Sequence, residues 1–297
     1  MSVSKKLSSF LVLFKQAIKG DQQDYTSGSI DKAIFLLSIP MILEMAMESL
    51  FAVVDVFFVS KLNDNNAVAT IGLTESLLTL IYSLAMGLSM GATAMVARRV
   101  GEKDIKSAEE AAAQAILVGI ALSILITLVG IFFSADLLRL MGASEELIEK
   151  NSGYTSWMLS GNITIMMLFL INGVFRGAGD ASIAMRSLWL ANTLNIALDP
   201  VFIFGFGPIP AYGVEGAAIA TNIGRGVGVL YQLYHLQKGS GLIKLRINNL
   251  IVQWNIIVRL IKVSAGGTGQ FLIGSASWIF LVLLCPTLEV LPLPVIR

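Results

Sequence analysis

Long apolar stretches separated by short polar intervals dominate the pattern along the chain. Seven of them reach the roughly 20 residues that a helix needs to cross a hydrocarbon core. They are Ala33–Ser60, Ala67–Ala97, Ala111–Phe133, Trp157–Phe175, Ser187–Phe206, Gly213–Leu236 and Val263–Cys285. Because these stretches are continuously apolar and do not alternate in polarity, they indicate helices and not the strands of a barrel. The pattern predicts an all-α fold, a polytopic membrane helix bundle.

The first 30 residues follow a different pattern. Their apolar positions fall on one helical face beside basic residues: Leu7, Phe10, Leu11, Phe14 and Ile18, with Lys15 and Lys19. A cleaved signal peptide is the alternative interpretation, but the apolar run is short and no small-residue cleavage site follows it. We interpret residues 1–30 as an amphipathic helix at the membrane interface, followed by a polar linker.

The polar interval after the sixth span divides the chain into unequal parts. We expect a six-helix lobe over residues 31–238, a cytoplasmic loop over 239–255, and the first helix of a second lobe over 256–297. An odd number of spans does not fit a transporter built from two equal halves. The sequence therefore predicts a truncated or frameshifted product, with a genuine seven-helix protein as the alternative.

Basic residues gather on one side of the predicted bundle. When the N-terminus is placed inside, the inside segments hold 16 of the 21 Lys and Arg residues and the outside segments hold 4. Cytoplasmic loops retain Lys and Arg, so this bias sets the orientation. It predicts a multi-pass protein of the plasma (inner) membrane with a cytoplasmic N-terminus.

Composition excludes several other classes of protein. The chain is 55% hydrophobic and 14% charged, whereas soluble domains are about 25% charged. A net charge of +1 offers no basic patch for nucleic acid. One cysteine and one histidine cannot build a disulfide framework or a Cys/His zinc cluster. Without a P-loop, a G-x-S-x-G elbow or an H-E-x-x-H pair, we expect neither an enzyme nor a bound cofactor.

Carboxylates occur at membrane depth, where each costs roughly 2.5–3.5 kcal/mol on insertion scales. Glu44, Glu48 and Asp55 are spaced by four and seven residues, so they share one stripe of the first helix. A stripe of carboxylates has to face a bundle interior or a wet cavity. Glu44 and Glu48 are therefore candidates for a cation-attracting vestibule. Glu75 in the second span lines a pathway or serves as interhelical hydrogen-bond glue.

The fifth and sixth spans add further oxygen ligands. Asn192, Asn195 and Asp199 share a face, and Pro200 leaves the carbonyl near Ile196 without its helical partner. Thr221 contributes a hydroxyl, and Arg225, one turn further on, is expected to neutralise a carboxylate or to reach the membrane interface. Two carboxylates, an amide and a hydroxyl suit Na⁺, or a proton with ordered water. The alternative for the amides and hydroxyls is interhelical hydrogen bonding.

Several short motifs occur in a characteristic order over roughly residues 31–236. They are Ser38-Ile-Pro40, Val54-Asp55, Ala97-Arg-Arg-Val-Gly101, Phe175-Arg-Gly-Ala-Gly-Asp180, Asn195-x-x-x-Asp199-Pro200 and Gly213-x-x-Gly216-Ala-Ala-Ile-Ala-Thr221. With them the sequence resembles the MATE (multidrug and toxic compound extrusion) transporters. The resemblance implies twelve helices in two lobes, and antiport of drug-like, often cationic, molecules against H⁺ or Na⁺.

The resemblance also implies site residues. In some members, residues placed like Asp55, Asn195, Asp199 and Thr221 form the cation site of the N-terminal lobe, and this would be the metal site if the coupling ion is Na⁺. Glu44, Glu48, Glu75 and Asn192 are the candidates for the substrate cavity. The expected partners are a small-molecule substrate, membrane lipid and a separately encoded C-terminal half, without nucleic acid.

Two other functions stay open at this point. A lipid-linked saccharide flippase of the same superfamily would bind an anionic pyrophosphate and would favour Arg and Lys in its cavity, whereas the candidates here are acidic. A truncated remnant that does not transport is the second alternative. The sequence names neither the substrate nor the coupling ion.

Overall fold

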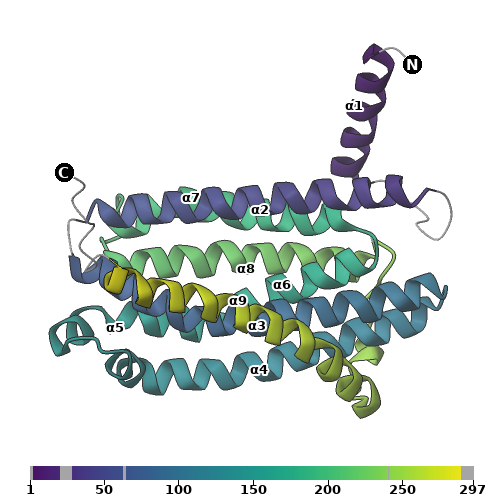
Figure 1. Ribbon diagram of the computed structural model, residues 1–297. Helices are drawn as coiled ribbons and strands as arrows, with labels where there is room; N and C mark the ends of the chain where they lie inside the picture. Colours follow the sequence, from purple (N-terminus) through teal and green to yellow (C-terminus); the bar gives the residue numbers. More distant parts are fainter. Residues whose placement is uncertain (1–2, 21–28, 63–64, 240, 289–297) are drawn as a thin grey trace, which may run out of the picture.

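The computed structural model describes residues 3–20, 29–62, 65–239 and 241–288 of the chain. The elements are α1 Val3–Lys19, α2 Ile30–Ser60, α3 Asn65–Gly101, α4 Ile105–Leu140, α5 Glu145–Ser160, α6 Asn162–Gly177, α7 Ala181–Phe204, α8 Val214–Lys238, the 3-10 helix η1 Ile247–Leu250, and α9 Trp254–Leu288. The predicted all-α fold is confirmed. Helices α2, α3, α4, α7 and α8 run along one another, while α1 stands at a steep angle to them (Figure 1).

Five helical segments in the described part of the chain are long and apolar enough to cross a membrane. They are Ala69–Gly101, Ile105–Leu140, Glu145–Gly177, Ala181–Phe204 and Trp254–Ala276. Helices α5 and α6 together make the third of these, with Gly161 at their junction. Helices α2 and α8 are not in this set, although they lie in the same bundle and carry Glu44, Glu48, Asp55 and Arg225.

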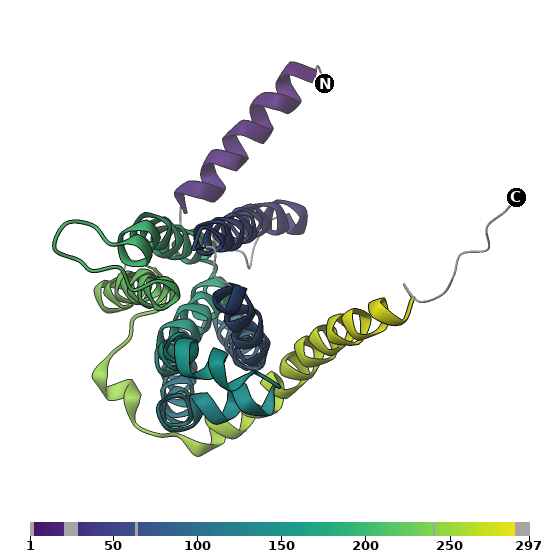
Figure 2. The ribbon, with the colours of Figure 1, turned by 90° about the vertical axis from the view of Figure 1, so that its left-hand side faces the viewer.

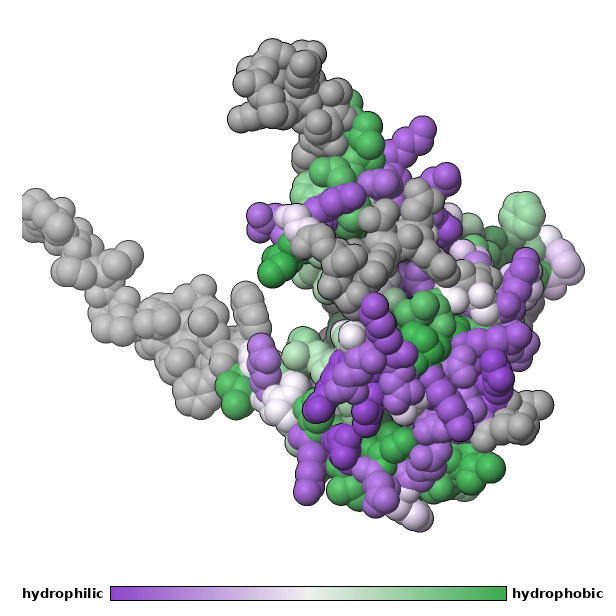
Figure 3. Space-filling view, turned by 90° about the vertical axis from the view of Figure 1, so that its right-hand side faces the viewer, coloured by the Kyte–Doolittle hydropathy of each residue, from purple (hydrophilic) through white to green (hydrophobic). Residues whose placement is uncertain are grey.

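The outer surface of the bundle is apolar along its length and polar at one end. On α4, Leu125, Ile131 and Phe132 are all more than half exposed, as expected of side chains that face acyl chains. Figure 3 faces the end at which α3 stops and α4 begins, and hydrophilic side chains gather there. Arg98, Glu102 and neighbouring charged residues belong to this end. The surface is that of a multi-pass membrane protein.

Helices α7 and α8 approach each other closely through small residues. A Cβ atom added to Gly224 would lie 2.5 Å from the carbonyl oxygen of Ala191, which is backbone and cannot move aside. Such small residues permit close helix packing where lipid supplies no hydrophobic driving force. Gly224 therefore sets how closely α8 packs against α7, the helix that carries Asn195 and Asp199.

Gly224→Ala is expected to destabilise the bundle by about 1–3 kcal/mol, because the added methyl group overpacks the α7–α8 contact. Gly226→Ala is the matched control on the same helix. Its Cβ would meet only Thr164 Cγ2 at 3.8 Å, so the higher helix propensity of Ala should leave stability unchanged or raise it by up to about 1 kcal/mol. Unfolding in detergent measures both variants. Equal stability of the two would contradict the close approach.

The segment between α8 and α9 is held against the bundle at several points. Gln114 of α4 donates to the carbonyl of Ile251 at 2.8 Å and accepts from the backbone N–H of Gln253 at 2.9 Å. Asp180 accepts from the N–H of Leu242 at 3.1 Å. Burial raises the pKa of Asp180, and this backbone hydrogen bond partly opposes the rise. The loop predicted to separate two lobes is therefore anchored to α4 and to the start of α7.

Helix α9 leaves this loop and crosses α3 obliquely (Figure 1), and Figure 2 shows it extending outward from the other helices. A Cβ atom on Gly87 of α3 would lie within 2.6 Å of the backbone nitrogen of Thr268. The crossing thus depends on a small residue in α3. The rest of the predicted segment after α9, residues 289–297, lies outside the described residues.

Helix α1 is attached to the bundle at its C-terminal end. Arg186 of α7 donates to the carbonyls of Ile18 and Lys19 at 2.8 Å and 2.6 Å, and Ala17 is buried. Leu11 and Val12 are exposed, while the side chains of Leu7 and Phe10 lie outside the described residues. A location of α1 at the membrane interface stays a prediction.

Candidate functional site

A cavity of about 560 Å³ lies among the helices of the bundle. Four charged side chains line it, two from α2, one from α3 and one from α8: Glu48, Asp55, Glu75 and Arg225. Aromatic and sulfur side chains supply much of the remaining wall, among them Phe51, Tyr82, Tyr154, Phe169, Met86 and Met158. An apolar cavity with a few polar groups is the usual form of a small-molecule site.

Two carboxylates from different helices lie near enough beside this cavity for their charges to interact. Asp199 of α7 is 0% exposed, and no donor reaches either of its oxygens with hydrogen-bond geometry, although the Asn195 side chain one turn away lies near enough to interact with its charge. Asp55 of α2 has a buried oxygen, Oδ1, that also lacks a partner. The charges of Asp55 and Asp199 lie close enough to repel each other. A buried charge without a partner is costly, so this pair calls for a cation or a proton.

An amide and a hydroxyl complete the group. The Asn195 Nδ2 atom donates to Thr221 Oγ1 at 2.9 Å, which links α7 to α8. The carbonyl oxygen of Asn195 is buried without a donor. Asn195 and Asp199 are one turn apart on α7, and Pro200 within this helix cannot donate to the carbonyl of Ile196. Unpartnered carboxylate and amide oxygens therefore gather between α2, α7 and α8.

Their chemistry suits a hard monovalent cation or a proton. Carboxylate, amide and hydroxyl oxygens are the ligands that such ions prefer. Among the described residues, no group of three or more His, Cys, Asp or Glu side chains is arranged to hold a metal ion. An ion in this place would depend on the amide and the hydroxyl as well as on Asp55 and Asp199.

The predicted cavity residues are divided between the cavity and the protein around it. Glu48 and Glu75 line the cavity, as do Asp55 and Thr221 of the candidate cation site, whereas Glu44 and Asn192 do not. Asn192 is buried and donates to Glu48 Oε2 at 2.9 Å. It therefore positions the carboxylate of Glu48, although its own side chain does not line the cavity.

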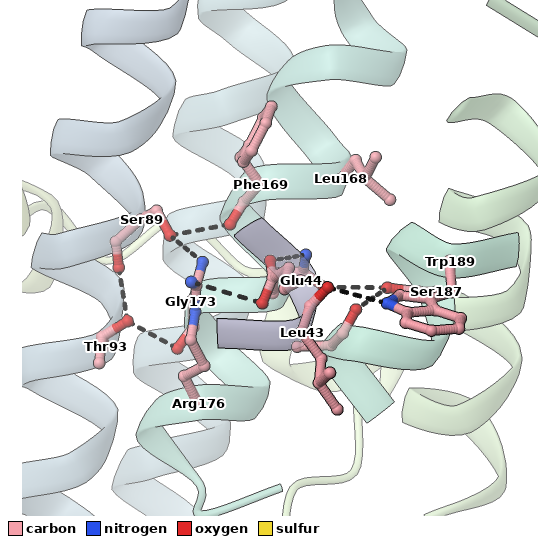
Figure 4. A network of polar contacts seen from close by, with 12 residues as sticks. Leu43, Glu44, Ser89, Thr93, Leu168, Phe169, Gly173, Arg176, Ser187 and Trp189 are labelled. Carbon is pink, nitrogen blue, oxygen red and sulfur yellow. Dashed lines mark hydrogen bonds and ion pairs between the residues drawn. The ribbon is translucent and has the colours of Figure 1, made fainter. Parts of the chain in front are cut away.

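Glu44 belongs to a second polar cluster, one turn of α2 away from Glu48 (Figure 4). It is 6% exposed. Its Oε1 atom accepts from Asn172 Nδ2 at 3.0 Å, and its Oε2 atom is 3.8 Å from Arg176 Nη1. Helix α2 is therefore tied to α6 through one carboxylate.

The cluster continues into α7 and α8. Gln232 Nε2 donates to Asn172 Oδ1 at 2.6 Å and to Ser187 Oγ at 3.0 Å. Asn172, Ser187 and Gln232 are all 0% exposed. These side chains form hydrogen bonds between helices. Interhelical hydrogen bonding was the alternative that the sequence left open for its buried amides.

Arg225 is a feature of the site to which sequence reasoning gave only a neutralising or interfacial role. It is 3% exposed, lies against the cavity and donates to Tyr82 at 3.0 Å. Its Nη2 atom is 3.8 Å from Glu48 Oε1. The expected pairing with a carboxylate is present, and the hydrogen bond to Tyr82 had no signal in the sequence.

A bundle of apolar helices with paired carboxylates and a polar-edged cavity in its interior is the architecture of a polytopic membrane transporter. The MatE family model matches residues 40–201. This match covers more than half of the chain, and the chain belongs to the MatE family.

Relatives and solved structures agree with this assignment. The chain is 27% identical over 231 residues to the multidrug export protein MepA of Staphylococcus aureus (strain bovine RF122 / ET3-1), a match that covers 77% of this chain and 50% of MepA. MepA of Staphylococcus saprophyticus is 25% identical over 245 residues, or 82% of this chain and 53% of that protein. The chain thus spans about half the length of the curated relatives that it matches.

Two solved structures are similar in fold and in sequence. A MOP superfamily transporter from Pyrococcus furiosus superposes with a TM-score of 0.79 at 31% identity, over 88% of this chain and 58% of that one. A MATE protein in complex with MaD5 gives a TM-score of 0.81 at 30% identity, over 92% and 59%. Both confirm the predicted family and fold.

Proposed function

We propose that this chain forms the N-terminal lobe of a secondary active antiporter, which exports drug-like or organic-cation molecules in exchange for Na⁺ or H⁺. The observation that carries the proposal is the pair Asp55 and Asp199 beside a cavity lined by aromatic and acidic side chains. Asp199 is buried with no donor to either oxygen, and half-buried Asp55 has one buried oxygen without a donor. Membership of the MatE family and the names of the MepA relatives support the export of drugs. Transport, and not catalysis, is the activity that we infer, and no cofactor beyond the coupling ion is needed.

The mechanism follows from the unpaired charge. A cation that enters from outside binds Asp55 and Asp199 together with Asn195 and Thr221, and it neutralises the two carboxylates. Their mutual repulsion then ends, and α2 can pack more closely on α7. This packing favours the state that releases substrate outward. Loss of the ion to the cytoplasm restores the repulsion and resets the lobe.

The proposal places the lobe in the plasma (inner) membrane with its N-terminus in the cytoplasm, because Lys and Arg gather at the end where α3 stops and α4 begins. A second lobe, which a separately encoded C-terminal half could supply, would close the other side of the cavity. Membrane lipid surrounds both lobes.

Two alternatives make different demands on the site. A lipid-linked saccharide flippase would need basic groups for pyrophosphate, whereas three of the four charged side chains that line the cavity are acidic. A remnant without transport activity would retain the fold but would move no substrate. The first alternative disagrees with the cavity, and the second is decided by measuring transport.

Cells that express this chain together with the C-terminal half of a MatE-family protein are expected to accumulate less of a fluorescent organic cation, rhodamine 123, than cells with an empty vector. Collapse of the ion gradient should abolish the difference, because the gradient drives export. A sodium ionophore and a protonophore, applied separately, identify the coupling ion. Accumulation equal to that of empty-vector cells, although both halves are inserted in the membrane, would contradict the proposed transport and favour the remnant.

A further inference from the structure

The side chain of Arg225 presents an unused donor in the cavity wall. It is 3% exposed and its Nη2 atom donates to Tyr82 at 3.0 Å. Its Nη1 atom is buried and has no hydrogen-bond partner. A guanidinium carries five N–H groups in a fixed fork, and a buried donor left unpaired is costly. The arginine therefore has capacity to bind a ligand.

Glu48 does not form a hydrogen bond with Arg225. The closest atoms of the two side chains, Arg225 Nη2 and Glu48 Oε1, are 3.8 Å apart, which is beyond hydrogen-bond distance. The other oxygen of Glu48 accepts from Asn192 at 2.9 Å. Glu48 balances the charge of Arg225 without engaging its fork in the bidentate geometry that carboxylates adopt with arginine.

The surroundings of Arg225 fit a flat amphiphile. Its guanidinium lies 5.7 Å from the ring centroids of both Phe51 and Tyr82. Phe51 and Tyr82 also line the cavity. An aromatic ligand could rest on these rings, while an anionic group of the same ligand reaches the guanidinium.

The cavity also holds groups of the opposite sign. Asp55 and Glu75 line it together with Arg225, and both interact electrostatically with that arginine. A purely cationic ligand would satisfy the carboxylates and leave the Nη1 atom of Arg225 without a hydrogen-bond acceptor. A ligand with a cationic and an anionic group would satisfy both.

We propose that Arg225 is a carboxylate-binding residue in the cavity, and that the preferred substrates are zwitterionic aromatic amphiphiles that carry a carboxylate as well as a cationic group. This inference rests on the proposed function and specifies its substrate class. It assigns the carboxylate of the ligand to the fork of Arg225 and its cationic group to the acidic side of the cavity.

A matched pair of dyes tests the proposal with the full chain in lipid nanodiscs. Rhodamine 110 carries a free carboxylate, and rhodamine 123 is its methyl ester and a simple cation. Fluorescence polarisation gives the Kd of each. The wild-type chain is expected to bind rhodamine 110 at least as tightly as rhodamine 123. An acidic cavity alone would instead prefer the ester, so much weaker binding of rhodamine 110 would overturn the proposal whatever the variants do.

Arg225→Gln is expected to weaken binding of rhodamine 110 about tenfold and to leave rhodamine 123 unchanged or more tightly bound. Arg225→Lys keeps the charge without the fork, and its Kd for rhodamine 110 should lie between those of the wild type and the Gln variant. It replaces the Gln variant in the test if that variant does not fold. Arg98→Gln, the same change at an exposed arginine, should alter neither Kd. Equal weakening of both dyes in the Arg225 variants would overturn the carboxylate role. If the wild-type chain binds neither dye, this result would instead contradict the proposed function.

Discussion

Asp199→Asn is expected to abolish the stabilisation of the chain by its coupling ion. In the wild-type chain, an ion that binds only the folded state adds about 2.7 kcal/mol of stability at a hundred times its Kd. The variant keeps the shape of the side chain but removes one of the two charges that attract the ion. Without ion, the same change should raise stability, because the repulsion between Asp55 and Asp199 is gone. Without ion, the variant should therefore be more stable than the wild type, and adding the ion should not stabilise it further.

The unfolding temperature in nanodiscs measures both effects. Na⁺ is compared with choline at equal ionic strength, and the proton is tested by titrating pH in choline. Asp136→Asn makes the same chemical change at an exposed aspartate in an ion pair with Arg139, which is worth little at a surface, so its ion response should match the wild type. A full response to the ion in Asp199→Asn would show that the ion binds elsewhere.

The helices could be predicted from hydropathy, but their ends could not. Helix α4 runs from Ile105 to Leu140, while the apolar pattern predicted Ala111–Phe133. The extra turns carry charged residues such as Lys106, Glu110 and Asp136, because a helix continues beyond the hydrocarbon when its own hydrogen bonds remain satisfied. In the same way, α5 begins at Glu145, before the predicted span that starts at Trp157. Hydropathy therefore indicates which residues lie in the hydrocarbon core, and not the residue at which a helix begins or ends.

The part of the candidate site that could be predicted is the part that depends only on charges within apolar spans. The sequence singles out Asp55 and Asp199 as charges within apolar spans, and in the bundle their charges lie near enough to interact. The roles of Glu44 and Glu48 could not be separated, because both lie on one stripe of α2 and spacing does not specify the facing helix. Glu44 meets Asn172 and Arg176, whereas Glu48 reaches the cavity. One turn of helix is enough to change the neighbours completely.

The contact between Glu44 and Arg176 carries the second large prediction. Arg176→Met is expected to destabilise the folded chain by about 3–5 kcal/mol, because it leaves the charge of Glu44 buried without its partner. Glu44→Gln should cost much less. The amide can still accept from Asn172, and Arg176, whose side chain is 19% exposed, keeps its contact with Ser89 and some access to water.

The double variant separates a lost ion pair from a general loss of packing. If the cost of Arg176→Met comes from the unpaired carboxylate, adding Glu44→Gln should recover most of it, with a coupling energy of about 2 kcal/mol or more. Unfolding in detergent at one lipid-to-detergent ratio gives the four free energies. Additive costs would mean that Arg176 stabilises α6 through its own packing, and that α2 is held at Glu44 by Asn172 alone. Recovery would instead identify this carboxylate as an electrostatic contact between α2 and α6, separate from the charges of Asp55 and Asp199 at the proposed ion site.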